Sequence, residues 1–121
     1  MNNFIQTILV GILLITAVQV EAHDQPKTIK GTYYIRGKTP IDPPADEPQD
    51  THMLMRLRGQ AAYELFNSMK VAASPDECLG NGAMTKRIGG MQCSKRSNGR
   101  DYSCDFSINI AEQKIDGGLV C

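Results

Sequence analysis

The strongest constraint on the fold is an alternation near the carboxyl end of the chain, between Tyr102 and Ile110. Apolar side chains occupy every second position there, namely Tyr102, Cys104, Phe106, Ile108 and Ile110. Polar side chains stand between them. Successive side chains of a β-strand point to opposite faces, so this period of two predicts a strand. One face would lie on a core and the other in water, as is typical of an antiparallel sheet.

The first 22 residues have the pattern of a secretory signal peptide. A long apolar run precedes Glu21, the first charged side chain, which stands between Val20 and Ala22. We expect cleavage after Ala22, which makes residues 23–121 the mature chain. The segment lacks the usual amino-terminal Lys or Arg. An uncleaved membrane anchor is the alternative, because the uncharged run is close to the ~20 residues that span a bilayer.

The mature chain would carry 13 basic and 12 acidic residues, which gives a net charge of +1. Such a balance provides no general attraction to nucleic acid or to membranes. We therefore expect no nucleic-acid partner and no stable membrane span after signal cleavage.

All four cysteines lie in the last 44 residues: Cys78, Cys93, Cys104 and Cys121. An even number of cysteines in a short exported chain predicts a disulfide framework. The periplasm and the extracellular space allow such bonds to persist. A domain of this size also needs them, because its core alone would supply only ~3–5 kcal/mol.

The amino-terminal part of the mature chain predicts one strand and one long connection. Residues 27–36 favour a strand, since Ile29, Tyr33 and Ile35 share one face. Residues 38–50 hold four prolines and four acids, which exclude a helix or a sheet ladder there. We interpret them as a solvated spacer between strand and helix. The alternative is an acidic docking arm for a basic partner.

Residues 51–71 predict an amphipathic helix capped by Asp50 or Thr51. Its apolar positions recur at helical spacing at Leu54, Leu57, Ala61, Leu65 and Met69, with Ala62 and Phe66 beside them. The stripe would pack on a sheet. Met53, Met55 and Met69 could instead bind a soft metal through sulfur, although methionines on a helix usually fill a core.

Several turn signals subdivide the residues after this helix. Ser74-Pro75-Asp76-Glu77 has the pattern of a capping box and predicts a short helical turn. Residues 84–94 favour a strand with a bulge at Gly89-Gly90. Asn98-Gly99 predicts a two-residue turn before the alternating strand, and Glu112-Gln113 predicts a second turn after it. The last strand would then present Ile115, Gly117, Leu119 and Cys121 on its apolar face.

The register of the two hairpins predicts the cysteine pairing. A two-residue turn in the first hairpin places Cys93 opposite Cys104 at a hydrogen-bonded position. In the second hairpin it places Cys104 opposite Cys121 at a non-hydrogen-bonded position. Side chains approach more closely at non-hydrogen-bonded positions, where a disulfide's short Cβ separation is easier to reach. We therefore predict the bonds Cys104–Cys121 and Cys78–Cys93.

The sequence offers little catalytic chemistry. The mature chain has only two histidines, His23 and His52. No zinc-ligand spacing, Cys-x-x-Cys motif or phosphate-binding glycine loop occurs, and no Ser–His–Asp or Cys–His arrangement can be argued. An enzyme is therefore the weaker interpretation. A mature chain that begins at His23 could chelate copper through its amine and imidazole, with His52 as a third ligand.

One cluster of basic residues is a candidate binding surface: Lys86, Arg87, Lys95, Arg96 and Arg100. The hairpin tip would present Lys95, Arg96 and Arg100 together. They could engage an acidic partner, a lipid headgroup, a glycan or nucleic acid. The alternative is a soluble hairpin tip whose charges prevent edge-to-edge strand pairing.

Together these patterns predict an α+β fold, in which one amphipathic helix packs on a three- to four-stranded antiparallel sheet with two disulfides. We expect a small periplasmic or secreted binding protein of inhibitor or immunity type. It would act on a protein partner in the cell envelope or outside the cell, without catalysis, cofactor or metal. The alternatives are a small exported enzyme and a periplasmic copper-binding protein that uses His23.

Overall fold

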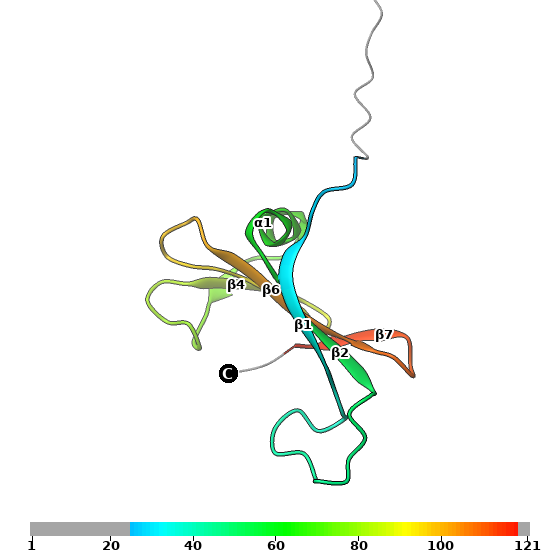
Figure 1. The fold of residues 1–121 in the computed structure, drawn as a ribbon. Coiled ribbons are helices and arrows are strands. Elements are labelled where there is room, and N and C mark those ends of the chain that lie inside the picture. Colours follow the sequence, from blue (N-terminus) through cyan, green and yellow to red (C-terminus); the bar gives the residue numbers. More distant parts are fainter. Residues whose placement is uncertain (1–24, 119–121) are drawn as a thin grey trace, which may run out of the picture.

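A computed structural model describes residues 25–118 and shows one helix on an antiparallel sheet of seven strands (Figure 1). The elements are β1 (Lys30–Arg36), β2 (His52–Arg58), α1 (Gly59–Ser68), β3 (Ser74–Pro75), β4 (Met84–Ile88), β5 (Met91–Lys95), β6 (Tyr102–Asn109) and β7 (Lys114–Gly117). The strand order is β1-β2-β6-β5-β4-β3, and β7 pairs with the end of β6 beyond β5. The predicted α+β class is confirmed, with more strands than the three or four expected.

The alternating segment forms the strand β6 in the middle of the sheet, as predicted. Cys104 and Phe106 are buried on the face that α1 covers in part. The opposite face, however, is not wet along its whole length. Ser107 is fully buried and donates its hydroxyl to the Gly117 carbonyl at 2.9 Å, and Asn109 is buried too. The prediction of a wet polar face is wrong there, because a central strand can be covered from both sides.

The helix is shorter than predicted, since its first third belongs to a strand. Residues 52–58 form β2, which pairs with β1 on one side and β6 on the other. Met53, Leu54 and Met55 are consecutive apolar residues, so no alternation marks this central strand. Its Met, Leu and Arg residues favour helix in isolation, and pairing with two neighbours outweighs that preference.

The helix begins without a side-chain cap, so the predicted caps Asp50 and Thr51 are also wrong. Gly59 has φ +64°, a left-handed conformation that lets the chain turn directly from β2 into α1.

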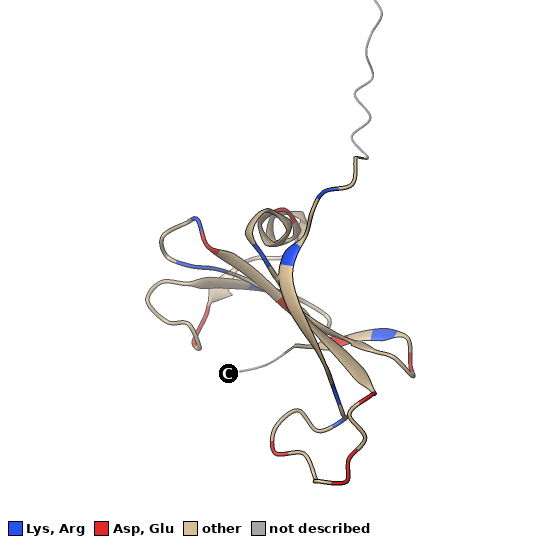
Figure 2. Cartoon of the chain, in the orientation of Figure 1, with Lys and Arg blue, Asp and Glu red and all other residues tan. Residues whose placement is uncertain are grey.

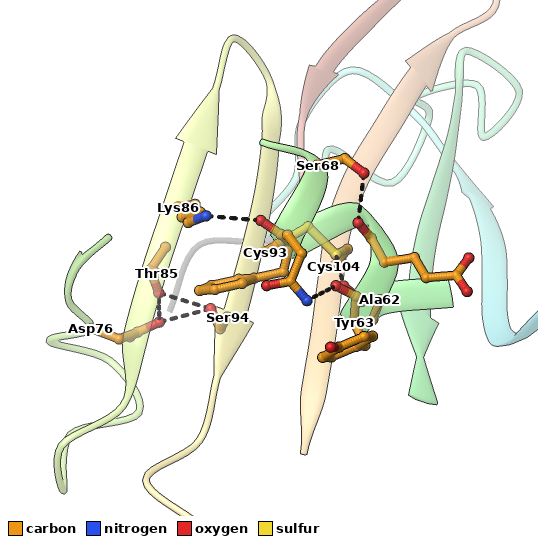
Figure 3. Close-up of a disulfide and its surroundings, with 12 residues drawn as sticks. Ala62, Tyr63, Ser68, Asp76, Thr85, Lys86, Cys93, Ser94 and Cys104 are labelled. Carbon is orange, nitrogen blue, oxygen red and sulfur yellow. Dashed lines mark hydrogen bonds between the residues drawn. A yellow bond between two sulfur atoms is a disulfide. The ribbon is translucent and has the colours of Figure 1, made fainter. Parts of the chain in front are cut away.

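The main hydrophobic cluster lies between α1 and the sheet and consists of Ala62, Phe66, Met69, Cys93 and Cys104. Tyr102 packs edge-on against Phe66, with ring centroids 5.4 Å apart. Lys86 reaches from β4 to the end of the helix, where its ammonium donates to the carbonyls of Phe66 and Met69, both at 3.1 Å. Figure 3 shows the Lys86 side chain pointing toward the helix. A cation here satisfies terminal carbonyls and complements the helix dipole.

The segment 84–94 is a hairpin and not one bulged strand. Ile88 stands opposite Met91, so Gly89-Gly90 forms a two-residue turn between β4 and β5. Gly89 has φ +54°, as such tight hairpin turns require. A Gly-Gly pair is typical of a two-residue hairpin turn, and the prediction of a bulge there was wrong.

The short turn around Cys78 is capped by Asp76, not by Ser74. Ser74 lies in β3 and pairs with Thr85 of β4. The Asp76 carboxylate accepts the backbone N–H groups of Cys78 and Leu79, both at 2.9 Å. The capping-box prediction is therefore wrong by two residues, although a turn does form.

The described disulfide joins Cys93 to Cys104, so both predicted pairings are wrong. The register of this hairpin was predicted correctly, but the loop has four residues and the last hydrogen-bonded pair is Arg96–Asp101. Alternating back from that pair places the two cysteines at a non-hydrogen-bonded position, where Cα atoms are closest. Their Cα atoms are 4.0 Å apart. Cys78 is not a free thiol either, and Cys121 lies outside the described residues.

The second hairpin also has a longer loop than predicted. Asn109 pairs with Lys114, which leaves the loop 110–113 where a two-residue turn was expected. Phe106 therefore stands opposite Gly117 and not Leu119. A shift of two residues keeps each side chain on its predicted face but changes every partner.

The predicted strand 27–36 is confirmed as β1, and the proline-rich loop connects it to β2, not to a helix. Glu47 organises this loop by accepting the Thr39 hydroxyl at 2.7 Å and the Thr39 N–H at 3.1 Å. Figure 2 shows acidic segments along the loop, at the end of the sheet away from α1.

Candidate functional site

One half of the sheet face that carries α1 is not covered by the helix. An unbroken row of apolar side chains crosses four strands there, from Ile35 to Met53, Ile108 and Ile115. A second row runs beside it through Tyr33, Met55 and Phe106. Figure 1 shows α1 nearly end-on over the other half of the sheet. We call Tyr33, Ile35, Met53, Met55, Ile108 and Ile115 the bare face.

The bare face is exposed and uncharged. Tyr33 is 66% exposed, Ile35 44% and Ile115 45%. Met53, Met55 and Ile108 are half-buried between them. The described strand residues that share this face on β1, β2, β6 and β7 include no charged side chain. A contiguous apolar patch with polar surroundings is typical of a protein-interaction surface.

A cleft of about 630 Å³ lies on the opposite face of the sheet, behind the half that α1 covers. Its floor is formed by β2, β5 and β6, and its walls by the turn after Asp76 and the loop 96–101. Four arginines line it: Arg56, Arg58, Arg96 and Arg100. We call it the arginine cleft.

The acids that line the arginine cleft are already engaged. The Arg56 guanidinium donates to Asp105 at 2.6 Å, and the Asn98 amide donates to Asp101. Arg58, Arg96 and Arg100 are exposed, and within residues 25–118 no ion pair engages their guanidinium groups. The guanidinium groups of these three arginines are therefore open to solvent in the cleft.

Asp76 is the most heavily bonded acid of the cleft. Its carboxylate accepts two backbone N–H groups and the hydroxyls of Thr85 and Ser94, the latter at 2.9 Å (Figure 3). Burial alone would raise the pKa of Asp76, but these hydrogen bonds outweigh it and hold the pKa below its usual value. The charged Asp76 carboxylate therefore links the turn to β4 and β5.

The structure brings together only part of the predicted basic site. Arg96 and Arg100 line the cleft. Lys95 pairs with Tyr102 on the α1 side of the sheet, Lys86 caps α1, and Arg87 donates to Gln92 at 2.9 Å. A strand sends neighbouring side chains to opposite faces, so Lys95 and Arg96 separate.

Two arginines of the cleft, Arg56 and Arg58, were not among the predicted site residues. Both fall within the segment predicted as a helix, whereas β2 carries them to the cleft face. Their alternation with Met55 and Leu57 was the available signal. It was obscured by Leu54, which is apolar and 3% exposed on the same face as the arginines.

The histidine chemistry considered for this chain is not supported by what surrounds His52. This residue is buried, and its Nδ1 lies 2.8 Å from the Thr51 hydroxyl and its Nε2 3.3 Å from Asp116. Thr51 also donates to the Arg36 carbonyl, and neither Thr51 nor His52 lines the cleft. In the described part of the chain no group of His, Cys, Asp or Glu could hold a metal ion. His23 lies outside it.

The methionines considered as a soft-metal site belong to different surroundings. Met69 is buried beneath the end of α1, whereas Met53 and Met55 lie on the bare face. They act as apolar contacts in the fold.

No protein-family model, curated protein or solved structure matches the chain. Among residues 25–118, no helix is long and apolar enough to cross a membrane.

Proposed function

We propose that this chain is an exported, non-catalytic binding protein of inhibitor or immunity type, which acts by protein–protein contact. The observation that carries the proposal is the bare face, an uncharged apolar surface across four strands. Disulfide bonding supports the export part, because such bonds persist in oxidising compartments such as the periplasm and the extracellular space.

The partner element that suits the bare face best is an amphipathic helix. Four neighbouring strands at about 4.8 Å spacing span about 14 Å. A helix of about ten residues, at 1.5 Å per residue, covers that width. The helix α1 has 10 residues and contacts β1, β2, β5 and β6 on the same face of the sheet. A partner helix beside α1 would complete this layer over the bare face.

The test is capture of a partner from cell envelope by the purified mature protein and by charged variants. Ile35→Asp and Ile115→Asp place a carboxylate at either end of the apolar row. Val71→Asp is the matched control, because Val71 is 39% exposed and lies outside the row. We expect one stoichiometric protein to bind the wild type and the control, and at least about tenfold less of it to bind either row variant.

Equal capture by all three variants, or no partner at all, contradicts the proposal. Light scattering of each protein supplies a second outcome. A wild-type dimer that Ile115→Asp converts to a monomer would assign the bare face to a second copy of this chain. Intact-mass measurement of the exported protein tests the predicted signal cleavage. We expect an amino terminus at His23.

A further inference from the structure

We propose that the arginine cleft binds a ligand that bears a phosphate or sulfate group. This site lies on the opposite face of the sheet from the bare face, so it does not depend on the function proposed above. The residues that would hold the oxyanion are Arg58, Arg96 and Arg100, with Ser103 on the floor of the cleft.

The cleft has more hydrogen-bond donors than acceptors. Each acid of the cleft already has its own partner, as described above. The three guanidinium groups remain open, and each can donate five N–H bonds but accept none. The hydroxyl of Ser103, on β6 between them, makes no hydrogen bond with the described residues. An incoming ligand must therefore supply oxygen acceptors.

These donors reach the cleft from different directions. Arg58 ends β2 and pairs with Ser103 on the floor, whereas Arg96 and Arg100 belong to the loop 96–101, which forms one wall. Donors from the floor and from a wall suit a tetrahedral oxyanion, whose oxygens point in several directions. A carboxylate has two oxygens in one plane and matches a single guanidinium fork.

The cleft is held rigidly and is large enough for a small molecule. Asp76 ties one wall to β4 and β5, and the Cys93–Cys104 bond fixes β5 to β6 directly behind the floor. A preorganised site loses less entropy when it binds. The cleft volume of about 630 Å³ is typical of a small-molecule site and far exceeds one phosphate, so the oxyanion would be part of a larger ester.

The experiment is an NMR titration of the disulfide-bonded protein with inorganic phosphate, sulfate and acetate at constant ionic strength. We expect saturable shifts in the amides of residues 58, 96–101 and 103 with phosphate and sulfate, and weaker effects with acetate. Arg58→Gln and Arg100→Gln should each weaken binding about fivefold, as expected for partly solvated charge pairs. Lys70→Gln removes the same charge from an exposed position outside the cleft and should change binding less than about twofold.

Three results overturn the proposal: no saturable shift, equal loss of binding in the Lys70→Gln control, or acetate binding as strong as phosphate. Phosphate monoester and sulfate monoester probes of similar size then distinguish the two ester classes. Arg100→Gln should leave partner capture unchanged, so failure of this site and failure of the proposed function give different results.

Discussion

The two halves of the sheet bury opposite faces. In the half beneath α1, the apolar face is buried by the helix and the reverse face opens into the arginine cleft. In the other half, the apolar face is bare and the reverse face is closed, with Leu54, Ser107 and Asn109 all buried there. The same strands, β2 and β6, run through both halves.

This difference shows that alternation along a strand does not decide which of its faces meets water. Each half has one covered and one open face, and each open face has its own chemistry. One half has three arginines that form no ion pair with residues 25–118, and the other has an uncharged apolar row. The surfaces that could recognise a ligand or partner are therefore the faces left over after the sheet has been packed.

The largest expected effect compares one side chain from each half. Phe66 lies in the cluster beneath α1, against Tyr102 and Lys86. Phe66→Ala should cost about 3–5 kcal/mol of unfolding free energy by leaving a cavity. Ile115→Ala on the bare face should cost under about 0.5 kcal/mol. Urea denaturation with disulfides intact measures both, and similar losses would mean that the bare face is packed.

The second prediction removes the covalent link behind the helix. Replacing both Cys93 and Cys104 by Ala opens a short loop and should cost about 3 kcal/mol in the chain-entropy model. Peptide mapping without reduction should recover the Cys93–Cys104 bond. A peptide that joins Cys78 to Cys93 would contradict the disulfide described above.

The third prediction uses pH to weaken the wall of the arginine cleft. The pKa of Asp76 is lowered in the folded protein, so its carboxylate contributes stability above the unfolded-state pKa near 3.8, and this contribution is lost as the pH falls through and below that value. Asp76→Asn should cost about 2 kcal/mol near pH 6. The difference between variant and wild type should shrink toward pH 3. A difference in unfolding free energy that stays constant from pH 6 to pH 3 would show that the charge on Asp76 does not contribute to stability.

The smallest effect concerns the closed reverse side of the bare half. Ser107→Ala removes the fully buried hydroxyl that donates to the Gly117 carbonyl and should cost about 1–2 kcal/mol. Ser103→Ala, four residues earlier on the same face, is the control and should cost under about 0.5 kcal/mol. If both serines can be replaced equally cheaply, the two halves do not differ on this face.

Part of both candidate surfaces could be predicted from the sequence. The alternation of β6 places Phe106 and Ile108 on the apolar side, and the hairpin loop supplies Arg96 and Arg100. The contribution of β2 could not be predicted, because Met53 to Leu57 suits a helix when considered alone. Pairing with β1 and β6 supplies contacts far along the chain that local patterns do not contain.

The cysteine pairing failed for a narrower reason. The predicted register was right, but loop length decides which pairs are hydrogen-bonded, and Asn98-Gly99 is compatible with loops of two or four residues. Asn98 bonds the backbone N–H groups of Arg100 and Asp101 with its side chain, which favours the longer loop. That local contact moved Cys93 and Cys104 to the position where a disulfide forms.

The sequence by itself determined the fold class, the β6 strand and its apolar face, because period-two alternation and turn residues act locally. Only the tertiary structure decided which face of each half is open, where the arginines gather and which cysteines join. Those outcomes depend on α1, which covers half of one face, and on the burial of Leu54, Ser107 and Asn109 on the reverse side of the other half. Burial depends on how separate segments pack against one another, so it cannot be predicted from the sequence of a single segment.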